Sequence, residues 1–183
     1  MIANHDRSGW FGASDVDYII GNRKTKSFER WWLIKLGLND TQLNTVPVIA
    51  GTYKEHQILD FCNIPEKDEQ ILIEDLRLRV NLDGNSDDTI FEVKTHKYNG
   101  KPFKVPIKYK RQVWVQMYAK QIRKAYIIAY AMQQEDYLNF FLDIDNSRLE
   151  YIPIDYNEKF INEIFLPNLI ELKECLVKGV FPY

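Results

Sequence analysis

The chain has 183 residues, of which 45% are apolar and 14% aromatic, and its formal net charge is −2. A chain of this length can bury a substantial core, and we expect a single domain over residues 1–183. No apolar run reaches the roughly 18 residues that span a bilayer, and the N-terminus has no apolar signal core. These features argue against a membrane partner and favour a cytoplasmic globular protein.

The chain contains two cysteines, Cys62 and Cys175, which are far apart and have no C-x-x-C partner. Two thiolates cannot supply the four ligands of a zinc or iron–sulfur site, so we expect ordinary buried thiols in a reducing setting. The histidines show no metal-ligand spacing, and no glycine-rich P-loop is present. The histidines are His5, His56 and His96.

Charge is distributed unevenly along the chain. The segment from Val93 to Lys124 contains ten cations and no acid, so the other residues hold 14 of the 24 cations and all 26 acids. A basic segment in an otherwise acidic chain predicts a surface that binds a polyanion such as nucleic acid. The ten cations are Lys94, Lys97, Lys101, Lys104, Lys108, Lys110, Arg111, Lys120, Arg123 and Lys124.

Three helices are predicted before the first strand. Ser14 is a typical N-cap for a short helix, and acidic residues follow it in the first turn. Ser27 is predicted to cap the second helix, which Gly37 ends. The helices are Ser14–Gly21, Phe28–Leu36 and Val48–Cys62, with a loop at Leu38–Pro47.

Alternating apolar residues predict a sheet in the remainder of the chain. A loop at Lys97–Lys108 precedes a helix from about Lys110 to Arg123, and Asp155 is predicted to cap a closing helix, Glu158–Lys178, interrupted at Pro167. Helices around a central sheet indicate an α/β or α+β layered domain. The predicted strands are Gln70–Glu74, Leu76–Asp83, Thr89–Thr95, Ala125–Met132, Tyr137–Asp145 and Leu149–Asp155.

Candidate metal ligands lie on two adjacent predicted strands. Asp83 ends one strand, and the next contains Glu92-Val93-Lys94. Carboxylates on paired strands can hold a hard divalent cation such as Mg²⁺ or Mn²⁺. Strand alternation places Glu92 and Lys94 on one face, where the ammonium can orient or deprotonate a water beside a phosphodiester. The pattern therefore predicts a metal-dependent phosphodiester hydrolase.

A glutamate on the third predicted helix could complete this site. Glu55 follows Gly51 by four residues, so both share one helix face. The glycine permits a close approach to the sheet, where Glu55 would point at the metal pocket. The alternative is a surface glutamate that pairs with Lys54 or His56.

The helix after the basic loop has a polar face. Gln112 and Gln116 are four residues apart and could bind a water or phosphate oxygens, or could form an ordinary polar surface. Three aromatic residues nearby could stack on bases, although packing against the sheet is favoured. These are Tyr109, Trp114 and Tyr118.

The N-terminal segment contains a candidate phosphate-binding pair. Arg7 precedes Ser14 by seven residues. A guanidinium and a hydroxyl near a helix N-terminus, where backbone N–H groups are free, can bind a phosphate. Ser14 is equally explained as a helix cap.

Five short motifs give the chain a family resemblance. In their order and spacing they resemble the YqaJ-like phage recombinase exonucleases, relatives of lambda exonuclease in the PD-(D/E)XK nuclease superfamily. Trp114 departs from the pattern, because the family often has a second glutamine there. The matching segments are Arg7–Asp15, Ala50–Glu55, Val80–Gly84, Phe91–Thr95 and Gln112–Met117.

The resemblance implies a restriction-endonuclease-like core, a central mixed sheet flanked by helices, with a divalent-metal site. Arg7 and Ser14 would bind the 5′-terminal phosphate of DNA. The implied catalytic residues are Asp83, Glu92, Lys94, Glu55 and Gln112. The implied metal ligands are Asp83, Glu92, Glu55 and the carbonyl of Val93. Further DNA contacts are expected from Gln116, Lys97, Lys101, Lys104, Lys108, Lys110 and Arg111.

The implied reaction is the 5′→3′ hydrolysis of one strand of double-stranded DNA. It leaves a 3′ overhang for a phage single-strand annealing protein, and family members can form ring-shaped homotrimers. The resemblance thus implies a phage or prophage protein that acts in the cytoplasm of a bacterial host.

Two alternatives remain open at this point. One is a PD-(D/E)XK endonuclease, such as a restriction or junction-resolving enzyme. The other is a non-catalytic DNA-binding or phage interaction protein on the same scaffold. The presence of every expected site residue favours the enzyme.

Overall fold

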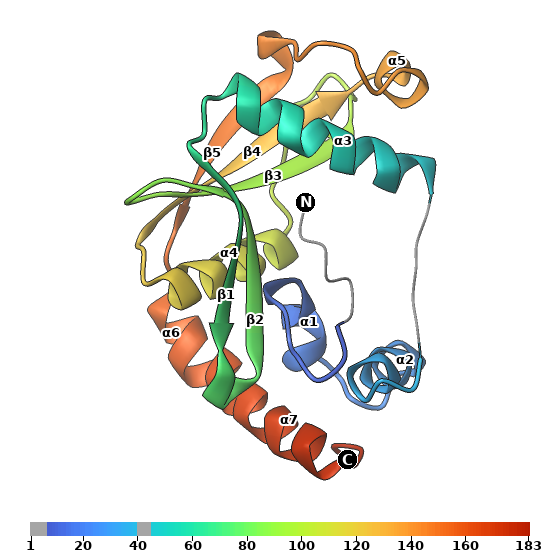
Figure 1. The fold of residues 1–183 in the computed structure, drawn as a ribbon, viewed down its shortest axis with the longest axis vertical. Helices are drawn as coiled ribbons and strands as arrows, with labels where there is room; N and C mark the ends of the chain where they lie inside the picture. Colours follow the sequence, from blue (N-terminus) through green and yellow to red (C-terminus); the bar gives the residue numbers. More distant parts are fainter. Residues whose placement is uncertain (1–6, 40–44) are drawn as a thin grey trace.

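A five-stranded mixed sheet lies at the centre of the computed structural model, which describes residues 7–39 and 45–183. β3 and β4 are parallel, whereas the other neighbouring strands are antiparallel. The predicted α+β layered class with a central mixed sheet is confirmed (Figure 1). The strands, in spatial order, are β1 (Glu66–Ile73), β2 (Leu78–Asn85), β3 (Ile90–Lys97), β4 (Lys124–Met132) and β5 (Leu149–Asp155).

Helices cover both faces of the sheet. α4 (Ile107–Lys120) connects the parallel strands β3 and β4, because parallel neighbours need a crossover connection. It begins three residues earlier than predicted and buries its apolar face in the larger core cluster. α3 (Val46–Phe61) covers the opposite face (Figure 1). The core residues of that second cluster are Ala50, Ile58, Leu59, Ile64, Val93, Ile128, Tyr130 and Met132.

The β1–β2 hairpin separates from the rest of the sheet. β2 pairs with β3 through two residue pairs, whereas β1 and β2 pair along their length, and Figure 1 shows the hairpin directed away from β3. Gly84 lies where the strands part. A Cβ there would lie 2.7 Å from Leu59 Cδ2 and 2.9 Å from Ile64 Cγ2, both in the core under α3. The absent side chain therefore lets the hairpin leave the sheet close against α3.

The N-terminal helices have different caps from those predicted. A 3₁₀ turn, Ala13–Asp15, leads into α1 (Val16–Ile19). Its cap is Gly12, whose N–H donates to the Asp15 carboxylate, so Ser14 lies inside the turn. α2 (Lys26–Lys35) is capped by Thr25, not Ser27, because the Thr25 hydroxyl accepts the N–H of Phe28.

The start of α3 also differs from the prediction. α3 begins at Val46, two residues before the predicted start, and Pro47 occupies its first turn, where its missing N–H is tolerated. Part of the predicted loop Leu38–Pro47, residues 40–44, lies outside the described residues, as do residues 1–6. Within the described ranges, no helix has the length and apolar character required to cross a membrane.

The prediction of a strand at Tyr137–Asp145 is wrong. α5 (Gln134–Leu138) ends there, followed by irregular chain and a 3₁₀ turn, Asn146–Arg148. The decisive residue is Asp136, which is fully buried and accepts the N–H of Gln133. It also lies 2.6 Å from Arg148 Nη1 and 3.6 Å from Lys54 Nζ, so a buried ion network replaces the predicted alternation.

The C-terminal helix is interrupted just before the predicted position, Pro167, and is capped by a different residue. α6 (Glu158–Phe160), a π-helical turn (Ile161–Phe165) and α7 (Leu166–Lys178) follow one another. Pro167 has no N–H to donate to the preceding turn, which therefore widens. The cap is Asn157, which accepts the N–H of Phe160, rather than Asp155.

Asp136 should contribute strongly to the stability of the folded protein. Asp136→Ala leaves the buried Lys54 and the adjacent Arg148 without their counter-charge. Loss of one partner of a buried ion pair costs about 3–5 kcal/mol, so we expect a loss of that size in the free energy of unfolding. Urea denaturation of the metal-free protein measures it, with the exposed Glu135→Ala on the same helix as the control. Equal stability of the two variants would contradict the role of the network.

Candidate active site

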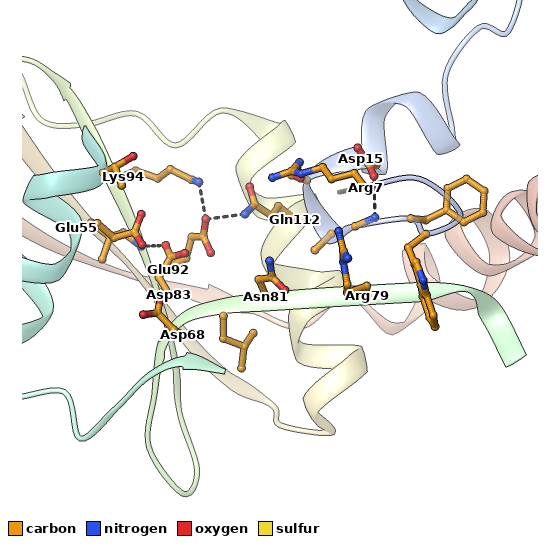
Figure 2. Close-up of a pocket in the computed structure, with 18 of the residues that line it drawn as sticks. Arg7, Asp15, Glu55, Asp68, Arg79, Asn81, Asp83, Glu92, Lys94 and Gln112 are labelled. Atoms are coloured by element: carbon orange, nitrogen blue, oxygen red, sulfur yellow. Dashed lines mark hydrogen bonds and ion pairs between the residues drawn. The ribbon is translucent and has the colours of Figure 1, made fainter. Parts of the chain in front are cut away.

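A cavity of about 330 Å³ opens where β2 separates from β3. Asp83 on β2 points into it and accepts the backbone N–H of Val93 on β3 at 2.8 Å. The carboxylate thus replaces a strand-to-strand hydrogen bond at the point where the ladder ends. Figure 2 shows Asp83, Glu55 and Glu92 converging there from β2, α3 and β3.

The carboxylate of Glu92 is held by three donors. Lys94 Nζ lies 2.5 Å away, Gln112 Nε2 2.6 Å and Gln116 Nε2 2.5 Å. Glu92 is 2% exposed and Gln116 fully buried. The shared face of Gln112 and Gln116 therefore faces this carboxylate. Burial also corrects the expectation that Gln116 contacts DNA, because it lies behind Glu92.

Lys94 is held as a cation. Burial would lower the pKa of its ammonium, but Glu92 and Asp83 outweigh burial and raise that pKa above its usual value. The ammonium also lies 4.8 Å from the ring centroid of Tyr109, a cation–π distance. In the protein alone, Lys94 can therefore orient a water or a phosphate oxygen more readily than it can accept a proton.

The negative charges of Glu55 and Asp83 are not balanced by nearby cations, and the pKa values of both carboxyl groups are raised. Burial, followed by the charge of Glu92, raises the pKa of Glu55 to about 7. Burial and the charges of Glu92 and Glu55 raise the pKa of Asp83 well above its ordinary value. Raised carboxyl pKa values are expected where a divalent-metal site lacks its cation. The oxygen-rich donor set fits Mg²⁺ or Mn²⁺.

Two residues that the sequence analysis did not assign to the site lie beside Glu55. Donor atoms of Glu55, His56 and Asp68 lie within 4.8 Å of one another, and His56 Nε2 is 3.3 Å from Asp68 Oδ2. The β1–β2 register places Asp68 opposite Asp83, and Asp68 has a left-handed backbone with φ +57°. The spacing of the histidines gave no signal, and the predicted first strand began after Asp68.

The other end of the cavity is cationic. Arg7 Nη1 lies 3.5 Å from Ser14 Oγ, so the two predicted phosphate-binding residues are adjacent. Phe11 bridges to Leu78 and fixes this segment beside β2. Arg79, which sequence reasoning missed, also lines the cavity. It could have been found from strand alternation, because Arg79, Asn81 and Asp83 are two residues apart on β2.

Lys35 also lines this end of the cavity, but an ion pair with Asp15 cancels its charge. Its ammonium lies 2.6 Å from Asp15 Oδ2, and both side chains are at most 8% exposed. Trp31 Nε1 donates to the other oxygen of the same carboxylate. Asp15 therefore ties α2 to the turn that carries Ser14.

The basic segment divides into two parts. Lys97, Lys101 and Lys104 are exposed and, within residues 7–39 and 45–183, form no ion pair. Lys97 lines a second cavity, described below. In contrast, Arg111 pairs with Asp17 at 2.9 Å and does not line either cavity. Lys110 is also outside both linings.

The remaining sequence predictions have simpler outcomes. Trp114 donates to the carbonyl of Asp155 and packs on Phe160, so it is part of the core rather than a base-stacking residue. A Cβ on Gly51 would lie 3.2 Å from Thr95 Oγ1, as expected for a helix that approaches the sheet closely. Both cysteines are free thiols, as expected, but they are half-buried rather than buried.

Solved exonuclease structures share this fold. An alkaline exonuclease (LHK-Exo) from Laribacter hongkongensis has a TM-score of 0.62 and 16% identity, over 94% of each chain. A phage related exonuclease from Haemophilus somnus 129PT has a TM-score of 0.68 and 13% identity, over 93% of this chain and 96% of the other. LHK-Exo in complex with dAMP has a TM-score of 0.68 and 16% identity, over 94% and 90%. No family model and no curated protein matches the sequence.

The raised pKa of Glu55 should make stability depend on pH. The folded state holds the Glu55 proton up to about pH 7, whereas an unfolded glutamic acid releases it near pH 4.5. Glu55 therefore lowers stability as pH rises through this window. Without metal, Glu55→Gln should exceed the wild type by about 1–3 kcal/mol above pH 7, at about 1.4 kcal/mol per pKa unit, and by little below pH 4.5.

Urea denaturation in EDTA between pH 4 and 8 tests this dependence, with the exposed Glu135→Gln as control. Excess Mg²⁺ should reverse the order, since a cation that binds the folded wild type stabilises it. A constant difference between wild type and Glu55→Gln at all pH values would disprove the raised pKa.

Proposed function

We propose that the protein is a divalent-metal-dependent deoxyribonuclease, an exonuclease that degrades one strand of double-stranded DNA from its 5′ end. The observation that carries the proposal is the convergence of Glu55, Asp83 and Glu92 around Lys94, beside a cationic pocket in one continuous cavity. Carboxylates beside a lysine suit phosphodiester hydrolysis, and the cationic end suits the phosphate of the substrate. The fold shared with solved exonucleases supports the same reading.

The metal-binding residues follow the resemblance to the YqaJ-like exonucleases, and the carboxylates present fit it. Asp83, Glu92 and the carbonyl of Val93 would hold one Mg²⁺ or Mn²⁺, and Glu55, with Asp68 beside it, would serve a second. A divalent cation there supplies charge that stabilises the developing negative charge on the phosphate oxygens. Its positive charge would also offset the repulsion that raises the pKa values of Glu55 and Asp83.

The other residues position the reacting groups. Gln112 and Gln116 fix the Glu92 carboxylate, which in turn holds the Lys94 ammonium on the side of the cavity. Lys94 then donates to a water or to a non-bridging phosphate oxygen and offers a positive charge close to the phosphate. Such preorganised donors need little rearrangement during the reaction.

The cationic end of the cavity would select a DNA end. A terminal phosphate carries more negative charge than a phosphodiester, with a second pKa near 6. Arg7, Ser14 and Arg79 line the place where such a group would bind. Lys35 contributes less, because Asp15 neutralises it. This charge arrangement favours an end-dependent exonuclease over an endonuclease.

The proposed biological role follows the resemblance to the YqaJ-like exonucleases. The enzyme would resect DNA ends 5′→3′ for recombination, in partnership with a single-strand annealing protein. It would act as a homotrimer in the cytoplasm of a bacterial host, encoded by a phage or prophage. The exposed cations Lys97, Lys101 and Lys104 would then face the DNA, while the acidic remainder faces outward.

Asp83→Asn should abolish DNA cleavage without unfolding the protein. The amide oxygen can still accept the N–H of Val93, but the charge that holds the cation is lost. The assay compares linear duplexes with covalently closed circles in Mg²⁺, with an EDTA control and the exposed Asp87→Asn as matched variant. We expect digestion of linear DNA alone. Cleaved circles would indicate an endonuclease, and cutting by Asp83→Asn would overturn the site.

Removal of the cationic end should weaken the preference for phosphorylated ends. Arg7→Ala and Arg79→Ala should each slow the first cut of 5′-phosphorylated DNA about 10-fold or more, as expected for loss of a charge-assisted hydrogen bond worth about 1.5–3 kcal/mol. Cutting of 5′-hydroxyl DNA should change little. Lys24→Ala, an exposed cation on the α1–α2 connection, serves as the control. Equal losses on both substrates would refute a phosphate-selective pocket.

A further inference from the structure

A second cavity of about 420 Å³ lies on the other side of Lys94. It shares the wall of Thr52, Glu55, Val93 and Lys94 with the first cavity and continues along β3 to Lys97. The second cavity therefore adjoins the carboxylates on the side opposite the cationic end, where a bound strand can continue. Its volume lies within the range of about 300–1,000 Å³ that is typical of ligand sites.

The lining of the second cavity differs chemically from that of the first. Its cations are Lys94 and Lys97, and its single acid is Glu55, at the boundary with the metal site. Aromatic surface is provided by Tyr109 and by Tyr137, the latter from α5. Cations beside aromatic rings are the combination that binds single-stranded nucleic acid, since they serve its phosphates and bases respectively.

One wall of the second cavity is rigidly supported. The Phe103 ring lies 4.6 Å from His96 and 6.5 Å from Tyr109, and its backbone N–H donates to Glu150. The ammonium groups of Lys94 and Lys108 lie 4.8 and 4.9 Å from the Tyr109 ring. Tyr109 is thus occupied by cations, which leaves Tyr137 as the ring for an incoming base.

We propose that the second cavity is a nucleotide subsite, which takes the nucleotide on the 3′ side of the bond that is cut. Its base lies against Tyr137 and its phosphate beside Lys97. The polarity rests on the proposed function, because a 5′ end at Arg7 directs the strand past Glu92 toward Lys97. The subsite would hold the strand across the site while the first cavity receives the product.

The test measures the first cut of 5′-phosphorylated duplexes by the full-length protein in Mg²⁺, under single-turnover conditions at increasing protein concentration. The duplexes carry all bases, or an abasic residue at nucleotide 2 or at nucleotide 6. For the wild type, loss of the base at nucleotide 2 should raise the half-saturating concentration about 10-fold, in line with removal of one stacked base. Loss of the base at nucleotide 6 should not.

Tyr137→Ala should raise the half-saturating concentration about 10-fold on intact DNA and remove the further effect of the abasic residue at nucleotide 2. Tyr137→Phe should behave as the wild type. Leu138→Ala, an exposed neighbour on α5 outside the cavity lining, is the matched control. Lys97→Ala, whose side chain is exposed, should weaken binding and reduce the salt dependence by about one counterion.

The outcomes separate the subsite from the proposed function. If the wild type cuts linear DNA but Tyr137→Ala keeps the full effect of the abasic residue, the subsite is wrong and the nuclease assignment stands. An effect at nucleotide 6 in place of nucleotide 2 would also overturn the subsite. If the wild type cuts no DNA with Mg²⁺ or Mn²⁺, both proposals fail.

Discussion

The separation of β2 from β3 is the constraint on which the candidate site depends. Two strands that part leave backbone donors without partners, and a buried unpaired donor costs about 1–3 kcal/mol. Asp83 satisfies the N–H of Val93 and so places a carboxylate at the opening. The same divergence exposes the edge of β3, along which both cavities lie. Gly84 permits it, because a side chain there would collide with residues under α3.

The site gathers like charges at the expense of stability. Glu55 and Asp83 carry raised pKa values because burial and neighbouring carboxylates oppose their ionisation. Lys94, Gln112 and Gln116 donate to Glu92, whereas Glu55 has no side-chain hydrogen-bond donor within the described residues. At the other end of the first cavity, Asp15 pairs directly with Lys35. The contrast distinguishes charges that stabilise the fold from charges that are reserved for a ligand.

Some of the ten cations of the basic segment are paired with acids in the folded protein, and others are exposed to solvent. Several cations of the basic segment are neutralised by acids of other elements, such as Arg111 by Asp17. Lys97, at the end of β3, is exposed and lines the second cavity, and Lys101 and Lys104 of the following loop are also exposed. The polyanion surface indicated by the sequence is therefore smaller than the run of ten cations, and it adjoins the proposed metal site.

The sequence by itself determined the layered α+β class and the grouping of Asp83, Glu92 and Lys94, because strand alternation and the hairpin turn are local properties. It also indicated Glu55 through its helical spacing from Gly51. Only the tertiary structure decided the places of Asp68 and Gln116. Asp68 reaches the site through pairing between strands, and burial turns Gln116 inward. The predicted strand at Tyr137 failed for the same reason, since the partners of Asp136 come from distant elements.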